Sequence, residues 1–140
     1  MKILIAVRGV ANRGKSASIK KAYQLLKSKY SGANFEEIIF KADIKIIITV
    51  KGVKVGIESQ GDPSSRLFES LKYFVEVGCQ VIICATRTRG ETFDAVNALA
   101  GQYQIKWIDK PNEPNPEQQE AANDTVAHEI YEEVLPLIPI

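Results

Sequence analysis

The stretch GVANRGKS, residues 9–16, matches the pattern G-x-x-x-x-G-K-[ST] at each of its fixed positions. It follows the apolar run ILIAV, residues 3–7, and precedes a helical pattern that runs from about residue 15 to residue 30. A glycine-rich turn between a buried strand and a helix can point its amide N–H groups inward, and the helix N-terminus favours anions. The stretch therefore predicts a strand–loop–helix unit that binds phosphate.

The fixed residues of this loop each have a physical role. Gly9 and Gly14 permit backbone angles and close approaches that a side chain would block. Lys15 can place a positive charge on the β- and γ-phosphates of a nucleotide, and the Ser16 hydroxyl can ligate Mg²⁺. A turn that only linked a strand to a helix would not need Lys-Ser directly after its second glycine.

Through this Walker A motif the chain resembles the P-loop NTPases. The resemblance implies that ATP and Mg²⁺ are the ligands, with Lys15 serving catalysis as well as binding. It also implies a set of nucleotide-binding residues that spans the loop, the first helical turn and one distant glycine. These residues are Gly9, Val10, Ala11, Asn12, Arg13, Gly14, Lys15, Ser16, Ala17 and Gly61.

The resemblance also requires a carboxylate at the end of another apolar strand, the Walker B element. The best match is VKVGIE, residues 53–58, which ends in Glu58, although the family more often has Asp at this place. With the residues that follow it reads E-x-x-G, so Glu58 is expected to act in catalysis and to hold Mg²⁺ together with Ser16. The Gly61 amide is then expected to meet the γ-phosphate. Asp62 is the alternative carboxylate, but it also suits the N-cap of a helix ahead of Pro63.

Two arginines, Arg87 and Arg89, follow the apolar run QVIICA, residues 80–85. The carboxyl ends of strands form the edge where ligands bind in α/β sheets, and an arginine there can stabilise the charge of a transferring phosphoryl group. The resemblance therefore makes Arg87 and Arg89 catalytic candidates, with Arg66 as a further one.

The remaining chain alternates strand and helix patterns, which indicates an α/β fold with a largely parallel sheet. We expect one P-loop domain over residues 1–140, with a three-layer α/β/α arrangement. The sheet is expected to have about five strands, one of them an antiparallel edge strand. Only Lys51-Gly52 separates two strand patterns, and so short a link forces an antiparallel hairpin. The expected strands are 2–7, 44–50, 53–57, 80–85 and 104–108, and the expected helices follow the first, third, fourth and fifth of them.

Composition sets further bounds. No apolar run is long enough to span a bilayer and the N-terminus lacks a signal-peptide pattern, so we expect a cytoplasmic protein with no membrane partner. Residues 1–60 carry a net charge of +8 and residues 61–140 one of −7. The basic half suits a nucleoside triphosphate. Nucleic acid is not excluded, but no aromatic–basic interleaving supports it. Cys79 and Cys84 are expected to be free thiols.

Three functions stay open at this point. A kinase would transfer the γ-phosphoryl group to an unknown small molecule or nucleotide, with an acceptor pocket or general base in residues 31–43, which include Glu36, Glu37 and Asp43. A hydrolase or nucleotide-dependent switch is favoured by the hairpin and the E-x-x-G, both features of Ras-like proteins. A non-catalytic nucleotide-binding adaptor is the third. The guanine-reading N-K-x-D motif is absent, so ATP is the expected nucleotide.

Overall fold

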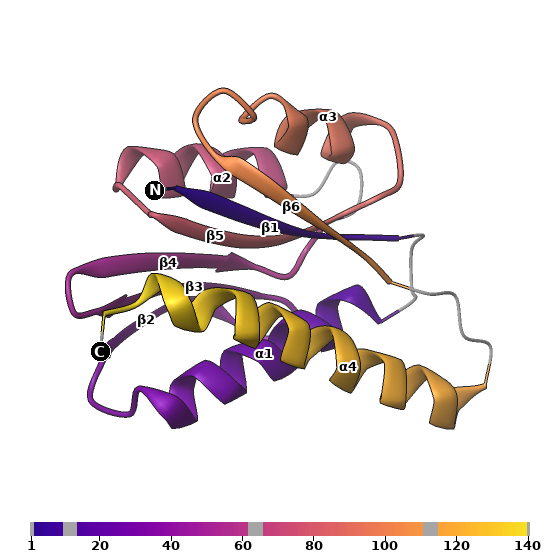
Figure 1. The fold of residues 1–140 in the computed structure, drawn as a ribbon. Coiled ribbons are helices and arrows are strands. Elements are labelled where there is room, and N and C mark those ends of the chain that lie inside the picture. Colours follow the sequence, from indigo (N-terminus) through magenta and orange to yellow (C-terminus); the bar gives the residue numbers. More distant parts are fainter. Residues whose placement is uncertain (1, 10–13, 62–65, 111–114, 140) are drawn as a thin grey trace.

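A mixed six-stranded sheet organises the computed structural model, which describes residues 2–9, 14–61, 66–110 and 115–139. The strand order is β2-β3-β4-β5-β1-β6 (Figure 1). Strand β1 pairs in parallel with β5 and β6, β4 pairs in parallel with β5, and β3 is antiparallel to both of its neighbours. The strands are β1 (Ile3–Arg8), β2 (Asn34–Phe40), β3 (Ile44–Val50), β4 (Val53–Glu58), β5 (Val81–Thr86) and β6 (Gln104–Asp109).

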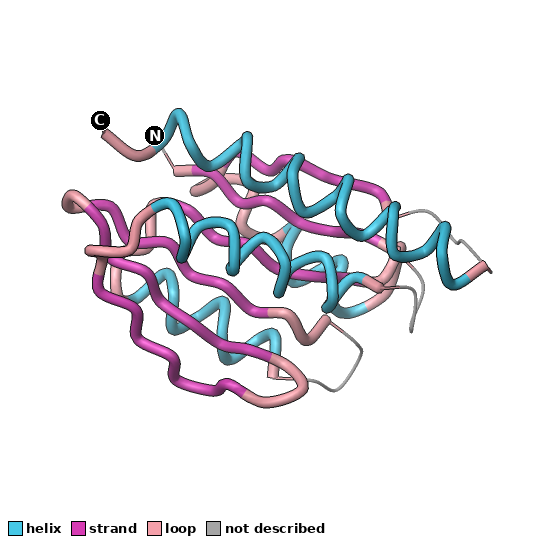
Figure 2. Tube along the Cα trace, turned by 90° about the horizontal axis from the view of Figure 1, so that it is seen from below, coloured by secondary structure: helices cyan, strands magenta, loops and turns pink. Residues whose placement is uncertain are grey.

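Helices cover both faces of this sheet (Figure 1). Helices α1 (Lys15–Lys29) and α4 (Pro116–Val134) lie side by side on one face, as Figure 2 shows from below. Helices α2 (Leu67–Glu76) and α3 (Glu91–Asn97) lie on the other face, and a short 3₁₀ helix (Leu135–Leu137) follows α4.

Two apolar clusters form the core because side chains alternate along each strand. In β1, Ile5 and Val7 pack toward α1 and α4, whereas Leu4 and Ala6 pack toward α2 and α3. All four side chains are fully buried, as expected for a strand covered on both faces. The alternation of strand and helix is thus confirmed as an α/β architecture.

The sheet differs from the predicted one in the number and the placement of its strands. Sequence patterns predicted about five strands with an antiparallel strand at the edge, but the described residues form six, and the antiparallel strand β3 is internal. The edge is taken by β2, which the prediction missed. Adjacent Glu36 and Glu37, and a register shift between Glu37 and Ile39, break the alternation that would mark β2 as a strand.

The hairpin predicted at Lys51-Gly52 is confirmed, with Val50 opposite Val53. Lys51 has a φ of 51° and Gly52 one of 81°, so both residues of the two-residue turn are left-handed. A turn of this kind matches the right-handed twist of the two strands, and it favours Asn or Asp followed by Gly. Lysine is therefore an unusual first residue here.

Two other sequence expectations can be compared with the structure. Cys79 and Cys84 are both free thiols, as predicted, and both are buried, which raises the pKa of each. None of the helices within the described ranges combines the length and the apolar character that a membrane crossing requires.

Candidate functional site

Helix α1 begins directly after Gly14, whose φ of 84° is a conformation that glycine adopts without strain. A methyl group on Gly14 would clash with Oδ1 of Asn123, a buried residue of α4. The Ser18 hydroxyl donates to the Gly14 carbonyl oxygen at 2.9 Å and lies 3.4 Å from the same Asn123 oxygen. Contacts from two helices therefore fix the second glycine of the predicted loop.

The Lys15 side chain lies in the interior of the site, with 6% of its surface exposed. Its ammonium donates to the main-chain carbonyl oxygens of Gly9, at 2.8 Å, and Thr86, at 3.0 Å. The Gly9 amide also donates to the Thr86 carbonyl oxygen, at 3.1 Å. The positive charge of Lys15 thus sits where the carboxyl ends of β1 and β5 meet the N-terminus of α1. Charge and helix dipole both favour an anion at this place.

Ser16 is bonded to a carboxylate that the Walker B comparison did not select. Its hydroxyl donates to Oδ1 of Asp43, which directly precedes β3, at 2.7 Å. The same oxygen accepts a bond from the Ser59 hydroxyl at 3.0 Å, and Ser59 accepts from the Ile44 amide at 2.8 Å. The structure therefore brings Asp43, and not Glu58, to the predicted metal ligand.

The Ser16 hydroxyl and the Asp43 carboxylate are oxygen ligands of the kind that an Mg²⁺ ion would use. Mg²⁺ takes oxygen ligands and usually needs one or two from the protein, because phosphate oxygens and waters complete its octahedron. A metal site built from protein alone is a different matter. Within residues 2–9, 14–61, 66–110 and 115–139, no group of three or more His, Cys, Asp or Glu side chains could hold a metal ion.

Glu58 is fully buried and is occupied by donors from this chain. Arg66 donates to both of its oxygens, from Nε at 2.8 Å and from Nη2 at 2.9 Å. The Ser70 hydroxyl donates to Oε1 at 2.6 Å, and the Gln60 amide donates to Oε2 at 3.0 Å. Glu58 thus ties the end of β4 to the start of α2. Strand parity explains this, because the even-numbered side chains of β4 face α2 while Ser16 lies on the opposite face.

Residues just after β4 connect the two carboxylates. The Gln60 side chain accepts a bond from the Arg66 amide at 3.2 Å, and its Nε2 lies 3.5 Å from Oδ2 of Asp43. The backbone of Gly61 lies against the end of β5, since a methyl group there would clash with the Ala85 carbonyl oxygen. Gly61 is therefore at the same sheet edge as Lys15.

Arg87 and Arg89 follow β5 at this edge, as their sequence position predicted. Arg87 is half-buried and directly follows Thr86, whose carbonyl oxygen binds the Lys15 ammonium. Its amide donates to the Thr92 hydroxyl at 3.0 Å, which joins it to α3, whereas Arg89 is exposed.

Some predicted residues are not part of this arrangement. Arg66 belongs to the Glu58 ion pair, and Ala17 lies half-buried in the first turn of α1. The predicted loop residues Val10, Ala11, Asn12 and Arg13, and the alternative carboxylate Asp62, lie outside the described residues.

The segment expected to hold an acceptor pocket is mostly an edge strand. Glu36 is exposed, and Glu37 accepts bonds from the Tyr23 hydroxyl at 2.6 Å and from Lys27 at 3.2 Å. The Tyr23 hydrogen bond and the Lys27 ammonium hold the pKa of Glu37 below its usual value. Of the three acidic side chains in this segment, the structure brings Asp43 alone to the predicted loop.

A second group at the same edge was not predicted. The Arg8 guanidinium lies 4.9 Å from the ring centre of Trp107 and pairs with Asp109 at 2.8 Å. The Trp107 ring is stacked on Phe93 of α3, with 4.9 Å between ring centres. This group packs at the sheet edge between β1, β6 and α3. The pairing of Arg8 with Asp109 could have been predicted by aligning the ends of β1 and β6, where the two residues are partners in the register.

No protein-family model matches the chain, and neither a curated protein nor a solved structure matches it. A function for this chain is therefore inferred from the motif and from the geometry around it.

Proposed function

We propose that the chain binds ATP with Mg²⁺ at the loop of residues 9–16, on a three-layer P-loop NTPase fold, and transfers the γ-phosphoryl group to a small molecule or nucleotide. The observation that carries this proposal is the position of Lys15. Its ammonium lies at the junction of β1, β5 and α1, bonded to the Gly9 carbonyl oxygen at the start of the loop. A bound phosphate would meet this cation together with the amides of the α1 N-terminus.

The other residues take the following roles in this proposal. Ser16 and Asp43 would hold Mg²⁺, which when bound would neutralise charge on the β- and γ-phosphate oxygens. Asp43 takes the role expected of Glu58, because every Glu58 oxygen is already bonded to Arg66, Ser70 or Gln60. An arginine from the pair after β5 would offset the charge that develops on the transferring group.

A nucleotide-dependent hydrolase or switch is the second candidate, and the Gln60 contacts favour it. Gln60 contacts the Asp43 carboxylate and the first residues of α2 through Arg66. A change at the Ser16–Asp43 pair on nucleotide binding or hydrolysis would therefore reach α2 through one side chain. Such a direct chain of contacts suits a protein whose conformation depends on the state of its nucleotide.

Calorimetry with ATP and Mg²⁺ tests the shared part of both candidates. Lys15→Ala is expected to abolish tight ATP binding, because it removes the ammonium that would meet the phosphate, and to leave the fold intact, because alanine favours the helix that begins at this residue. Lys21→Ala is the matched control, since Lys21 lies on the same helix but pairs with Asp124 at 2.6 Å. Equal ATP affinity in wild type and Lys15→Ala would refute the proposal.

A labelled-phosphate assay then separates the candidates. Transfer of label to an added metabolite or nucleoside supports the kinase, and release of inorganic phosphate without an acceptor supports the hydrolase. Tight binding without either product supports the non-catalytic adaptor.

A further inference from the structure

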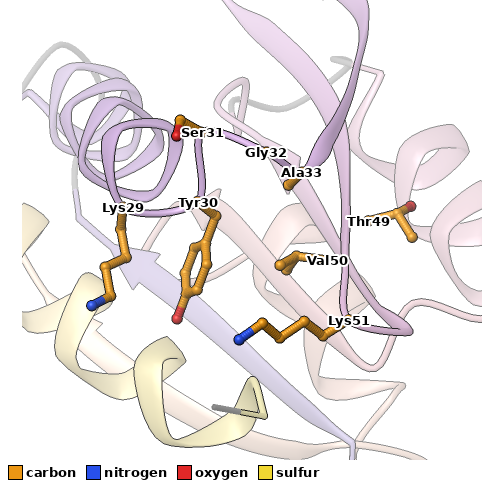
Figure 3. Close-up of a pocket in the computed structure, with 8 residues that line it drawn as sticks. All are labelled: Lys29, Tyr30, Ser31, Gly32, Ala33, Thr49, Val50 and Lys51. Carbon is orange, nitrogen blue, oxygen red and sulfur yellow. The ribbon is translucent and has the colours of Figure 1, made fainter.

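A hollow of about 510 Å³ lies at the opposite end of α1 from the phosphate loop. It is formed by the turn that ends α1 and by the hairpin between β3 and β4 (Figure 3). The residues that line it are Lys29, Tyr30, Ser31, Gly32, Ala33, Thr49, Val50 and Lys51, and none of them is acidic.

The two lysines of this hollow differ from the lysines that form ion pairs. Lys21, Lys27 and Lys106 each pair with a carboxylate. The ammonium groups of Lys29 and Lys51, by contrast, make no hydrogen bond or ion pair with any residue that the structure describes. Figure 3 shows their ammonium groups extending toward the same side of the hollow as the Tyr30 hydroxyl.

The position of Lys51 adds to this argument. Its left-handed backbone is strained for a lysine, and Asn, Asp or Gly would fit the turn better. Lys29 has another explanation, since a cation in the last turn of a helix offsets the helix dipole. That explanation does not extend to Lys51, which lies on the hairpin. A strained residue that contributes a charge to a hollow indicates a ligand.

We propose that this hollow binds a small molecule that carries a phosphate-monoester dianion. The two ammonium groups and the Tyr30 hydroxyl can donate to the phosphate oxygens, and the charge of Lys29 also offsets the negative end of the α1 dipole, which would otherwise oppose the dianion. Burial and the neighbouring Tyr131 raise the pKa of Tyr30, so the phenol keeps its proton at neutral pH. The volume exceeds that of a bare phosphate, and the half-buried Tyr30 ring with the buried Val50 offers an apolar wall for an organic group.

This site is independent of the phosphate loop. Helix α1 has 15 residues, so its two ends lie roughly 22 Å apart at about 1.5 Å per residue. The test therefore uses the Lys15→Ala protein, in which the loop no longer competes for the probe. Its outcome stands whether or not the chain binds ATP.

Nuclear magnetic resonance of the ¹⁵N-labelled protein, titrated with adenosine monophosphate, provides the measurement. We expect saturable shifts at the amides of residues 30–33 and 49–52. Lys51→Asn is expected to weaken binding about tenfold, because one charge-assisted contact is lost. The same substitution should raise the melting temperature, since Asn suits the left-handed turn, so lost binding cannot be ascribed to unfolding.

Two double lysine substitutions with the same change in charge test whether the hollow itself binds the probe. Lys29→Gln/Lys51→Gln should abolish the shifts, whereas Lys41→Gln/Lys72→Gln, with the same change in charge at exposed lysines outside the hollow, should keep them. The proposal is overturned if no saturable shift occurs at these amides up to about 10 mM probe. It is also overturned if Lys51→Asn binds as tightly as its parent, or if succinate, a dicarboxylate, binds as tightly as adenosine monophosphate.

Discussion

Replacing Asp43 and Glu58, one at a time, by their amides separates the carboxylate that serves the site from the one that serves the fold. The two substitutions remove the same charge and change almost no volume. The structure gives them opposite consequences, because the donors around the two side chains are arranged differently.

Glu58→Gln is expected to destabilise the protein by about 2–3 kcal/mol. Both Glu58 oxygens accept bonds, so the new amide nitrogen would face a donor from Arg66, Ser70 or Gln60 whichever way it turned. Removing one partner from a fully buried ion pair costs more than this. We lower the figure because 22% of the Arg66 side chain is exposed and water can solvate it. Affinity for ATP with Mg²⁺ should change little.

Asp43→Asn is expected to change stability by less than about 1 kcal/mol. Ser16 and Ser59 both donate to Oδ1, so the amide oxygen can keep both bonds, and among the described residues Oδ2 has only the long contact with Gln60. Affinity for ATP should fall about 10- to 100-fold in the presence of Mg²⁺, the size of loss that follows when groups supporting a metal site are changed, and should be unchanged without it.

Urea unfolding followed by circular dichroism, and calorimetry with and without Mg²⁺, measure both quantities on the same samples. A double-mutant cycle of Glu58→Gln with Arg66→Gln isolates the energy of the ion pair. The reasoning is refuted if Glu58→Gln weakens Mg²⁺-dependent binding while Asp43→Asn does not. In that case the Glu58–Arg66 pair opens when nucleotide arrives, and Glu58 holds the metal as the E-x-x-G pattern predicted.

Three further outcomes follow from the geometry. Gly14→Ala should destabilise the protein by about 2–4 kcal/mol in urea unfolding, because of left-handed backbone strain and the clash with Asn123. A second substitution, Asn123→Ala, should recover only the share of the free energy that is lost to the clash. Burial and the Glu37 hydrogen bond raise the pKa of Tyr23. The stability that the protonated Tyr23 contributes is therefore fully present below pH about 10 and is lost as the pH rises above that value. In Tyr23→Phe the free energy of unfolding should fall less steeply with pH above about 10. Equal slopes in the variant and the wild type would argue against this role of Tyr23. Replacing Arg87 and Arg89 together by Gln should lower the single-turnover rate about 100-fold or more with ATP affinity retained, and an unchanged rate would exclude both as charge-stabilising groups.

The sequence predicted those parts of the fold that depend on local patterns. Buried strands such as β5 show unbroken apolar runs, and the two-residue link at Lys51-Gly52 permits only an antiparallel hairpin. Strand β2 was missed because it lies at the edge and carries adjacent glutamates. Its stability comes from pairing with β3, and its own sequence pattern does not show that pairing.

A phosphate loop could be proposed from the sequence because the motif lies in eight consecutive residues. Asp43 could not be proposed as the partner of Ser16, because it is 27 positions away and their contact depends on the order of strands in the sheet. The direction in which the Glu58 side chain points could have been predicted from the alternation of side chains along β4. Glu58 has the same parity as Gly56 and faces the side that α2 covers, and α2 is the next helix along the chain.

Helix α1 relates the two proposed anion sites to one another. The Debye length at physiological ionic strength is about 8 Å, so charges roughly 22 Å apart along the helix are screened from each other. Direct repulsion between a nucleotide at Lys15 and a phosphate monoester at Lys29 is therefore negligible. Coupling between the sites would require α1 to move against α4, and Asn123 would resist that motion because it packs against both Gly14 and Ser18. The close contact that shapes the loop thus makes α1 a rigid spacer, and the two sites should bind their ligands independently.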